Sequence, residues 1–83
     1  MDRYRKGMMA RSKAGHDAGK LYVIIDVCGA YVYLADGRIR TMARPKRKKV
    51  RHIQLINREY DVSLADDAQI RRILKEYNKE EEI

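Results

Sequence analysis

A dense run of positive charge lies near the middle of the chain, where six Lys and Arg side chains fall within the eight residues from Arg44 to Arg51. Cations packed so closely repel one another, and a polyanion relieves that repulsion. Two alternatives stay open: a solvated loop and, in a cell with a nucleus, an import signal. We predict a phosphate-binding segment made of Arg44, Lys46, Arg47, Lys48, Lys49, Arg51 and His52.

A second cluster of cations surrounds two glycines four residues apart, Gly15 and Gly19. Glycine lets backbone N–H groups approach a phosphate closely, and neighbouring cations add attraction. The spacing is not that of a nucleotide-binding P-loop, because only three residues separate the glycines and Leu21 follows Lys20. We predict a turn that holds a sugar-phosphate backbone, with an ordinary reversal between strands as the alternative. Its candidate ligands are Arg11, Lys13, Gly15, His16, Gly19 and Lys20.

The residue types that enzymes and metal sites need are scarce in this sequence. It has one cysteine, Cys28, and two histidines, with no Cys-x-x-Cys or His-x-x-x-His spacing. We therefore predict no catalytic residue, no metal site and no cofactor, although an enzyme acting on RNA stays open as an alternative. We expect Cys28 to be a buried, inert thiol at the end of an apolar strand. A single cysteine excludes a disulfide within the chain and fits a reducing compartment.

Charge is distributed unevenly along the 83 residues, whose net charge is +7. Residues 1–60 carry 15 basic and 5 acidic side chains, whereas residues 61–83 carry 4 and 7. We therefore place the anion-binding surface in the first part and expect the acidic tail to face away from it. The longest apolar run, at 21–28, is too short to span a membrane, and no apolar stretch follows the basic N-terminus. We expect a cytoplasmic protein with no membrane partner.

Short strands must position these groups. We predict strands at 8–12, at 21–28, from residue 30 or 31 to 35, and at 50–56, with a weaker apolar segment at 39–43. The strand at 21–28 is apolar on both faces, which is typical of a central, covered strand. Spacing of about ten residues favours a mostly β fold, a small barrel of about five strands, over βαβ units. A chain of this length makes one domain, 1–83, with a basic arm at 1–6, the barrel at 7–57 and a C-terminal α-helix at 66–80.

The predicted helix begins with a capping box, Asp66 followed by Gln69. Its apolar stripe of Ile70, Ile73, Leu74 and Tyr77 must pack on the barrel, because so short a helix is marginal alone. We expect Tyr22 and Ile24, or Tyr31 and Tyr33, to receive it. Basic and acidic residues are interspersed along the helix, so we expect no basic face, and the acidic residues at 80–82 predict fraying at its end.

Several tyrosines and aspartates carry secondary expectations. Tyr31 and Tyr33 have the chemistry to stack on bases, but we expect them to serve the core or the docked helix. Tyr4, in the basic arm, is the better candidate for stacking on a base. The aspartates at turns and strand ends are expected to bond to the backbone, and they are Asp17, Asp26 and Asp36.

Residues 12–27 resemble a KOW motif, and the likeness continues through 31–37 and into the basic run and His at 44–52. With the capped helix it covers roughly residues 7–57 and the chain end. The chain is similar to small bacterial KOW-domain RNA-binding proteins, which are in turn similar to a large-subunit ribosomal protein family. The resemblance implies an SH3-like barrel whose turn after the first strand contacts ribosomal or other structured RNA. The residues that match this turn are Lys13, Gly15, His16, Gly19 and Lys20.

Charge and resemblance together predict an RNA-binding protein that contacts ribosomal or other structured RNA mainly through the phosphate backbone. The expected partner is ribosomal RNA or the large ribosomal subunit, with ribosome association, a role in translation and no small-molecule substrate. A transcription-elongation or protein-interaction module is the alternative. If the run at 46–49 only faces RNA, replacing all four residues by Ala should weaken RNA binding and leave the thermal midpoint nearly unchanged.

Overall fold

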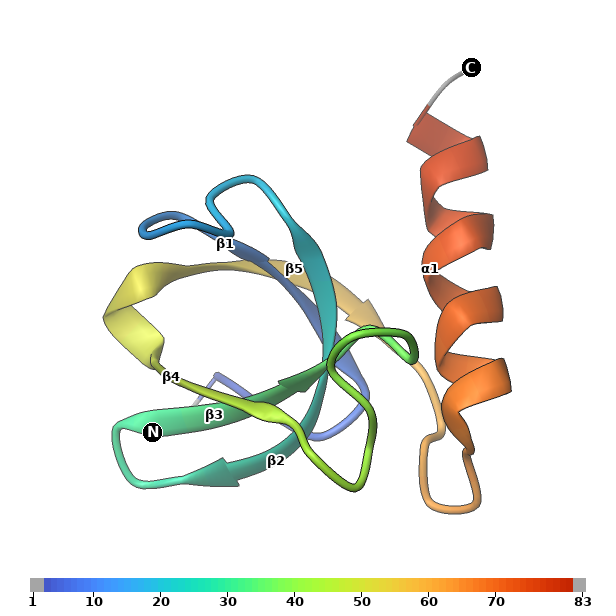
Figure 1. Cartoon of the computed structure of the whole chain (residues 1–83), viewed down its shortest axis with the longest axis horizontal. Coiled ribbons are helices and arrows are strands. Elements are labelled where there is room, and N and C mark those ends of the chain that lie inside the picture. The colour runs from blue at the N-terminus through green and yellow to red at the C-terminus, as the bar shows by residue number, and fades with distance from the viewer. Residues whose placement is uncertain (1–2, 82–83) are drawn as a thin grey trace.

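The computed structural model describes residues 3–81, which form five strands, one 3₁₀ helix and one α-helix (Figure 1). The first two residues of the predicted arm and the last residues of the predicted frayed end, at 82–83, lie outside the described part. In chain order the elements are β1 (Met8–Ser12), β2 (Leu21–Cys28), β3 (Tyr31–Ala35), β4 (Lys46–Lys49), η1 (Val50–His52), β5 (Ile53–Glu59) and α1 (Asp67–Glu81).

The five strands make one antiparallel sheet in the order β4-β3-β2-β1-β5. The predicted mostly β fold with five strands and a C-terminal helix is therefore confirmed. The sheet curls strongly, and α1 stands against its outside (Figure 1). Within residues 3–81 the edge strands β4 and β5 do not pair with each other, so the curled sheet stays open, and η1 joins its two edges through the chain.

The sheet has a separate apolar core on each face, and β2 contributes to both. Tyr22 and Ile24 point into the curl, whereas Val23 points outward beneath α1. The expectation that Tyr22 and Ile24 receive the helix is wrong, because the neighbouring strands already cover them inside the curl. The inner core consists of Met8, Ala10, Tyr22, Ile24, Val32, Leu34 and Ile53. The outer core consists of Met9, Val23, Ala35, Ile70, Ile73, Leu74 and Tyr77.

A bulge in β2 corrects the prediction for Cys28. The pairing with β3 shifts between Ile24 and Asp26, so the simple alternation of faces breaks at this point. Val27 then packs against the inner core with Tyr22 and Ile24, and Cys28 lies exposed at the strand end. The expectation of a buried thiol is wrong because the bulge turns Val27 toward the inner core and leaves Cys28 on the other face, at the exposed end of the strand.

The fourth strand lies where the sequence shows a run of cations. Lys46–Lys49 forms β4, whereas the apolar segment at 39–43 forms no strand. The strand predicted at 50–56 begins later and ends later, at Ile53–Glu59, because η1 takes its first three residues. Four consecutive cations carry no apolar alternation, so periodicity could not identify β4.

The loop after β3 fastens α1 to the sheet. The predicted cap is present, since Asp66 Oδ1 accepts a hydrogen bond from the Gln69 N–H at 2.9 Å. Asp67 Oδ1 accepts another from the Met42 N–H at 2.8 Å, and Arg71 Nη1 donates to the Gly37 carbonyl at 2.6 Å. Gly37 itself, with φ of 78°, lies so close that a Cβ would stand 2.4 Å from the Asp67 carbonyl oxygen.

We predict that Gly37→Ala destabilises the protein more than Gly19→Ala. Both residues have a positive φ, 78° and 87°, but nothing lies within 4 Å of a Cβ at Gly19. Gly19→Ala should cost about 1–2 kcal/mol from its backbone conformation, and Gly37→Ala at least about 3 kcal/mol because it also displaces α1. Urea unfolding followed by circular dichroism measures both losses. Equal losses would show that the close approach of Gly37 to α1 contributes nothing.

Candidate nucleic-acid interface

The predicted phosphate-binding turn is organised by a carboxylate, Asp17, that sequence reasoning assigned to backbone bonding. Asp17 Oδ1 accepts hydrogen bonds from Ser12 Oγ at 2.9 Å and Lys48 Nζ at 2.8 Å. Its Oδ2 accepts one from Tyr22 Oη at 3.0 Å and faces Lys46 Nζ at 3.0 Å. One side chain thus joins the turn to β1, β2 and β4.

This network is mostly shielded from solvent, since the side chains of Asp17 and Lys48 are 10% and 9% exposed and that of Lys46 is 26% exposed. Burial alone would raise the pKa of Asp17, but hydrogen bonds from Lys48, Lys46, Ser12 and Tyr22 outweigh it and hold this pKa far below the usual range. Burial and the same carboxylate raise the pKa of the Tyr22 hydroxyl. Asp17 is therefore a charged, fully engaged acceptor at neutral pH.

The basic run at 44–52 divides into two sets because strand residues alternate between faces. Lys46 and Lys48 lie opposite Leu34 and Val32 on the inner face, where Asp17 engages their ammonium groups. The other β4 residues, Arg47 and Lys49, face outward and are exposed.

Tyr31 and Tyr33 flank this outward set on β3. Lys49 lies opposite Tyr31, and Arg47 lies opposite Tyr33. The Arg47 guanidinium stacks over the Tyr31 ring, with 4.7 Å between the guanidinium carbon and the ring centroid. Both tyrosines are half-buried and belong to neither core, so the expectation that they serve the core or the helix is not met.

The structure brings the two predicted clusters together at one end of the sheet. The Lys13 N–H donates to the His52 carbonyl at 2.9 Å, and Lys48 Nζ donates to the Ala14 carbonyl at 2.8 Å. These bonds place the turn beside β4 and η1, with His16 exposed on the turn. We call the resulting surface the basic edge, and it comprises Lys13, His16, Arg47, Lys49, Arg51 and His52.

The remaining predicted ligands lie elsewhere or support the turn. Arg11 is half-buried and donates to the Gly19 carbonyl at 3.0 Å, which braces the turn from within. Lys20 turns toward Asp36, with 2.8 Å between Nζ and Oδ2. Arg44 is exposed in the loop before β4. The two glycines have φ of 85° and 87°, as the predicted tight reversal requires.

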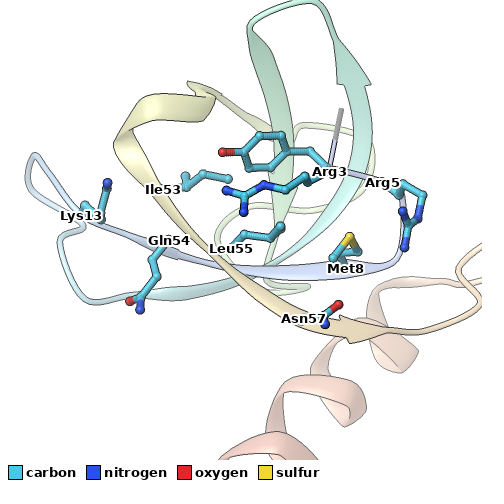
Figure 2. Close-up of a pocket in the computed structure, with 9 residues that line it drawn as sticks. Arg3, Arg5, Met8, Lys13, Ile53, Gln54, Leu55 and Asn57 are labelled. Atoms are coloured by element: carbon cyan, nitrogen blue, oxygen red, sulfur yellow. The ribbon is translucent and has the colours of Figure 1, made fainter. Parts of the chain in front are cut away.

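A groove of about 820 Å³ runs beside β5 and reaches the basic edge at Lys13 (Figure 2). Figure 2 shows Lys13 at one end of the groove and Arg5, which pairs with Glu59 at 2.7 Å, at the other. Tyr4 lines this groove and packs against the inner core, so it is not a free side chain of the arm, and its stacking on a base stays a prediction. Sequence reasoning missed the polar lining residues Arg3, Gln54 and Asn57, which no motif marks.

Metal-binding clusters and membrane-spanning helices are both absent from the described part of the chain. Among residues 3–81, no group of three or more His, Cys, Asp or Glu side chains is placed to hold a metal ion. The one α-helix in this range is neither long enough nor apolar enough to cross a bilayer.

We predict that Asp17→Asn lowers stability by about 2–4 kcal/mol at pH 7, because two shielded lysines lose their counter-charge. The folded-state pKa of Asp17 lies below the unfolded-state value of about 4, so its contribution is present above pH 4 and is lost as the pH falls. The difference in the free energy of unfolding between wild type and Asp17→Asn should therefore become smaller below pH 4. Urea unfolding at a series of pH values measures it.

Asp26→Asn is the control, since the Asp26 side chain is exposed and, among residues 3–81, accepts a hydrogen bond only from the adjacent Val27 N–H. A gap of the same size for both variants, or one that does not change with pH, would contradict the role of Asp17. The same network changes the expectation for replacing 46–49 by Ala: the thermal midpoint should fall, because Lys46 and Lys48 hold the turn.

Comparison with known proteins adds no identification. No protein-family model matches the sequence, and no significant match is found among curated proteins. The resemblance to KOW-domain proteins therefore rests on the residues of the chain itself.

Proposed function

We propose that this protein binds RNA, mainly through the phosphate backbone, at the basic edge. The observation that supports this most directly is that Asp17 pairs with some of the cations and leaves others unpaired. Lys46 and Lys48 form ion pairs with Asp17. Lys13, Lys49 and Arg51 are exposed and have no acidic partner within residues 3–81. Exposed, unpartnered cations gathered on one edge attract a polyanion and release its counterions on binding.

The chemistry of the edge suits phosphate groups better than a small substrate. Lysine ammonium groups act as mobile point charges, whereas the guanidinium of Arg47 lies over the Tyr31 ring and presents a planar set of N–H donors suited to phosphate oxygens. A small hollow of about 320 Å³ beside Tyr31 is bordered by Lys49 and Arg51. Phosphate contacts of this kind position a nucleic acid without reading its sequence, so we expect affinity with little base specificity.

Structured RNA of the ribosome is the target that we propose, and translation is the process. The support is the net charge of the first 60 residues and the resemblance of the turn and the basic run to KOW-domain proteins. The proposed phosphate contacts make association with such RNA sensitive to salt.

We predict that Lys49→Gln with Arg51→Gln weakens binding to poly(U). Each lost phosphate contact lowers the logarithmic salt slope by about 0.7 on single-stranded RNA, so the double variant should lose about 1.4. Both side chains are exposed and form no ion pair with an acidic side chain among residues 3–81, so thermal stability should not change. Fluorescence anisotropy over a series of salt concentrations measures affinity and slope.

The matched control is Leu64→Glu with Gln69→Glu, which lowers the net charge by the same amount at exposed positions away from the edge. The control should keep most of the affinity and all of the slope. If both double variants weaken binding equally, only overall charge matters and the basic edge is not the binding surface.

In a cell lysate, we predict that the protein sediments with the large ribosomal subunit at low salt and leaves it at high salt. Gradient fractionation followed by immunoblotting measures its position. The Lys49→Gln, Arg51→Gln variant should leave at lower salt than wild type. Sedimentation at the top of the gradient at every salt concentration would contradict the ribosomal target, whereas the poly(U) measurement would still test RNA binding.

A further inference from the structure

A second basic groove lies on the other side of the sheet, between the sheet and α1. Its volume is about 810 Å³, and its floor includes Leu21 and Leu74. Six of its lining residues are cations, and one is an acid, Asp36. The six cations are Lys20, Arg38, Arg71, Arg72, Lys75 and Lys79.

The helix contributes four of these cations because its charges are sorted around its circumference. Arg71, Lys75 and Lys79 follow one another at intervals of four residues and so share one flank. Glu76 and Glu80 belong to the neighbouring row, which begins at Arg72, and Glu80 pairs with Arg58 of β5. The expectation that α1 has no basic face is therefore wrong, whereas the expectation that the acidic tail faces away from the anion-binding surface of the first part stays a prediction. Sequence order mixes charges that the helix separates.

Within residues 3–81, few acidic side chains neutralise the positive charge of this groove. Asp36 is buried and pairs with Lys20 at 2.8 Å. Burial alone would raise its pKa, but Lys20 and the N–H groups of Arg38 and Arg40 hold this pKa below its usual value. Arg71 bonds to the Gly37 carbonyl and carries its charge into the groove uncompensated. Of the six cations that line the groove, five have no acidic partner within residues 3–81, namely Arg38, Arg71, Arg72, Lys75 and Lys79.

We propose that this groove is a second contact for the phosphate backbone of the bound RNA. The inference rests on the proposed function and extends it. Lys20 connects the two sites, because it is the last residue of the turn that carries Lys13 and His16 and it also lines this groove. The row from Arg71 to Lys79 spans about 12 Å at 1.5 Å per residue. One strand of a duplex carries three or four phosphates over roughly that length. The site is concave, which fits a strand better than the flat surface of an anionic bilayer.

The test compares three double variants with equal losses of net charge. Arg72→Gln with Lys75→Gln removes groove charge, and Lys49→Gln with Arg51→Gln removes edge charge. The control is Lys6→Gln with Leu64→Glu, at exposed positions that line neither site. Glutamine is a good helix former, so the groove variant should retain its helix, which circular dichroism checks. We expect the groove variant to lose about 1.4 from the salt slope on poly(U), as the edge variant does. Combining groove and edge substitutions should make the losses add.

The outcomes separate this inference from the function on which it rests. If the groove variant behaves like the control while the edge variant is weakened, the groove inference is wrong and RNA binding stands. If wild type shows no salt-dependent binding to poly(U), RNA binding itself is wrong. Phosphatidylglycerol vesicles and polyglutamate serve as further probes. Loss of binding to either by the groove variant, with poly(U) binding intact, would assign the groove to a membrane or an acidic protein and overturn the inference.

Discussion

The end of the protein that we propose to bind RNA depends on one constraint, the shielded carboxylate of Asp17. β4 is an edge strand of four cations and contributes no side chain to either apolar core. Its inner face therefore needs a counter-charge, and Asp17 supplies one to both Lys46 and Lys48. An ion pair of this kind adds little net stability over an apolar contact, but leaving either partner without the other is costly. The pairing thus specifies where the turn lies and which face of β4 turns inward.

Strand geometry converts one uniform run of charge into two kinds of residue. Alternation sends every second cation to Asp17 and leaves the others exposed beside Tyr31 and η1. A charge run in a sequence is thus a poor measure of the charge available to a ligand. For this protein the exposed half, with Lys13 from the turn, is the surface that we propose for RNA.

The helix applies the same principle with a different period. Its apolar stripe docks on Met9, Val23 and Ala35, which leaves one flank toward the groove and one toward β5. Cations lie on the first flank and glutamates on the second, where Arg58 stacks on Tyr77 and pairs with Glu80. The net charge of the tail does not reveal this separation, because it sums the charges of both flanks. Gly37 permits the close approach of the first turn of α1 to the loop after β3.

Local patterns in the sequence determined much of the fold. Short apolar segments bounded by turn residues marked β1, β2 and β3, the capping box marked the start of α1, and the two glycines marked the turn. These signals are local because a strand, a cap and a tight turn each depend on residues close in the chain. The cations that form the basic edge were also recognisable from their density.

Tertiary structure decided which of those cations are free and where the others go. The bond from Lys48 to Asp17 joins residues 31 positions apart, and no local pattern specifies such a pairing. The bulge in β2, which exposes Cys28, and the strand β4 were likewise set by pairing with β3. The groove along α1 exists only once the apolar stripe has docked. The ion-pair partner of a charged side chain and its exposure to solvent both depend on the whole fold, because residues far apart in the sequence determine them.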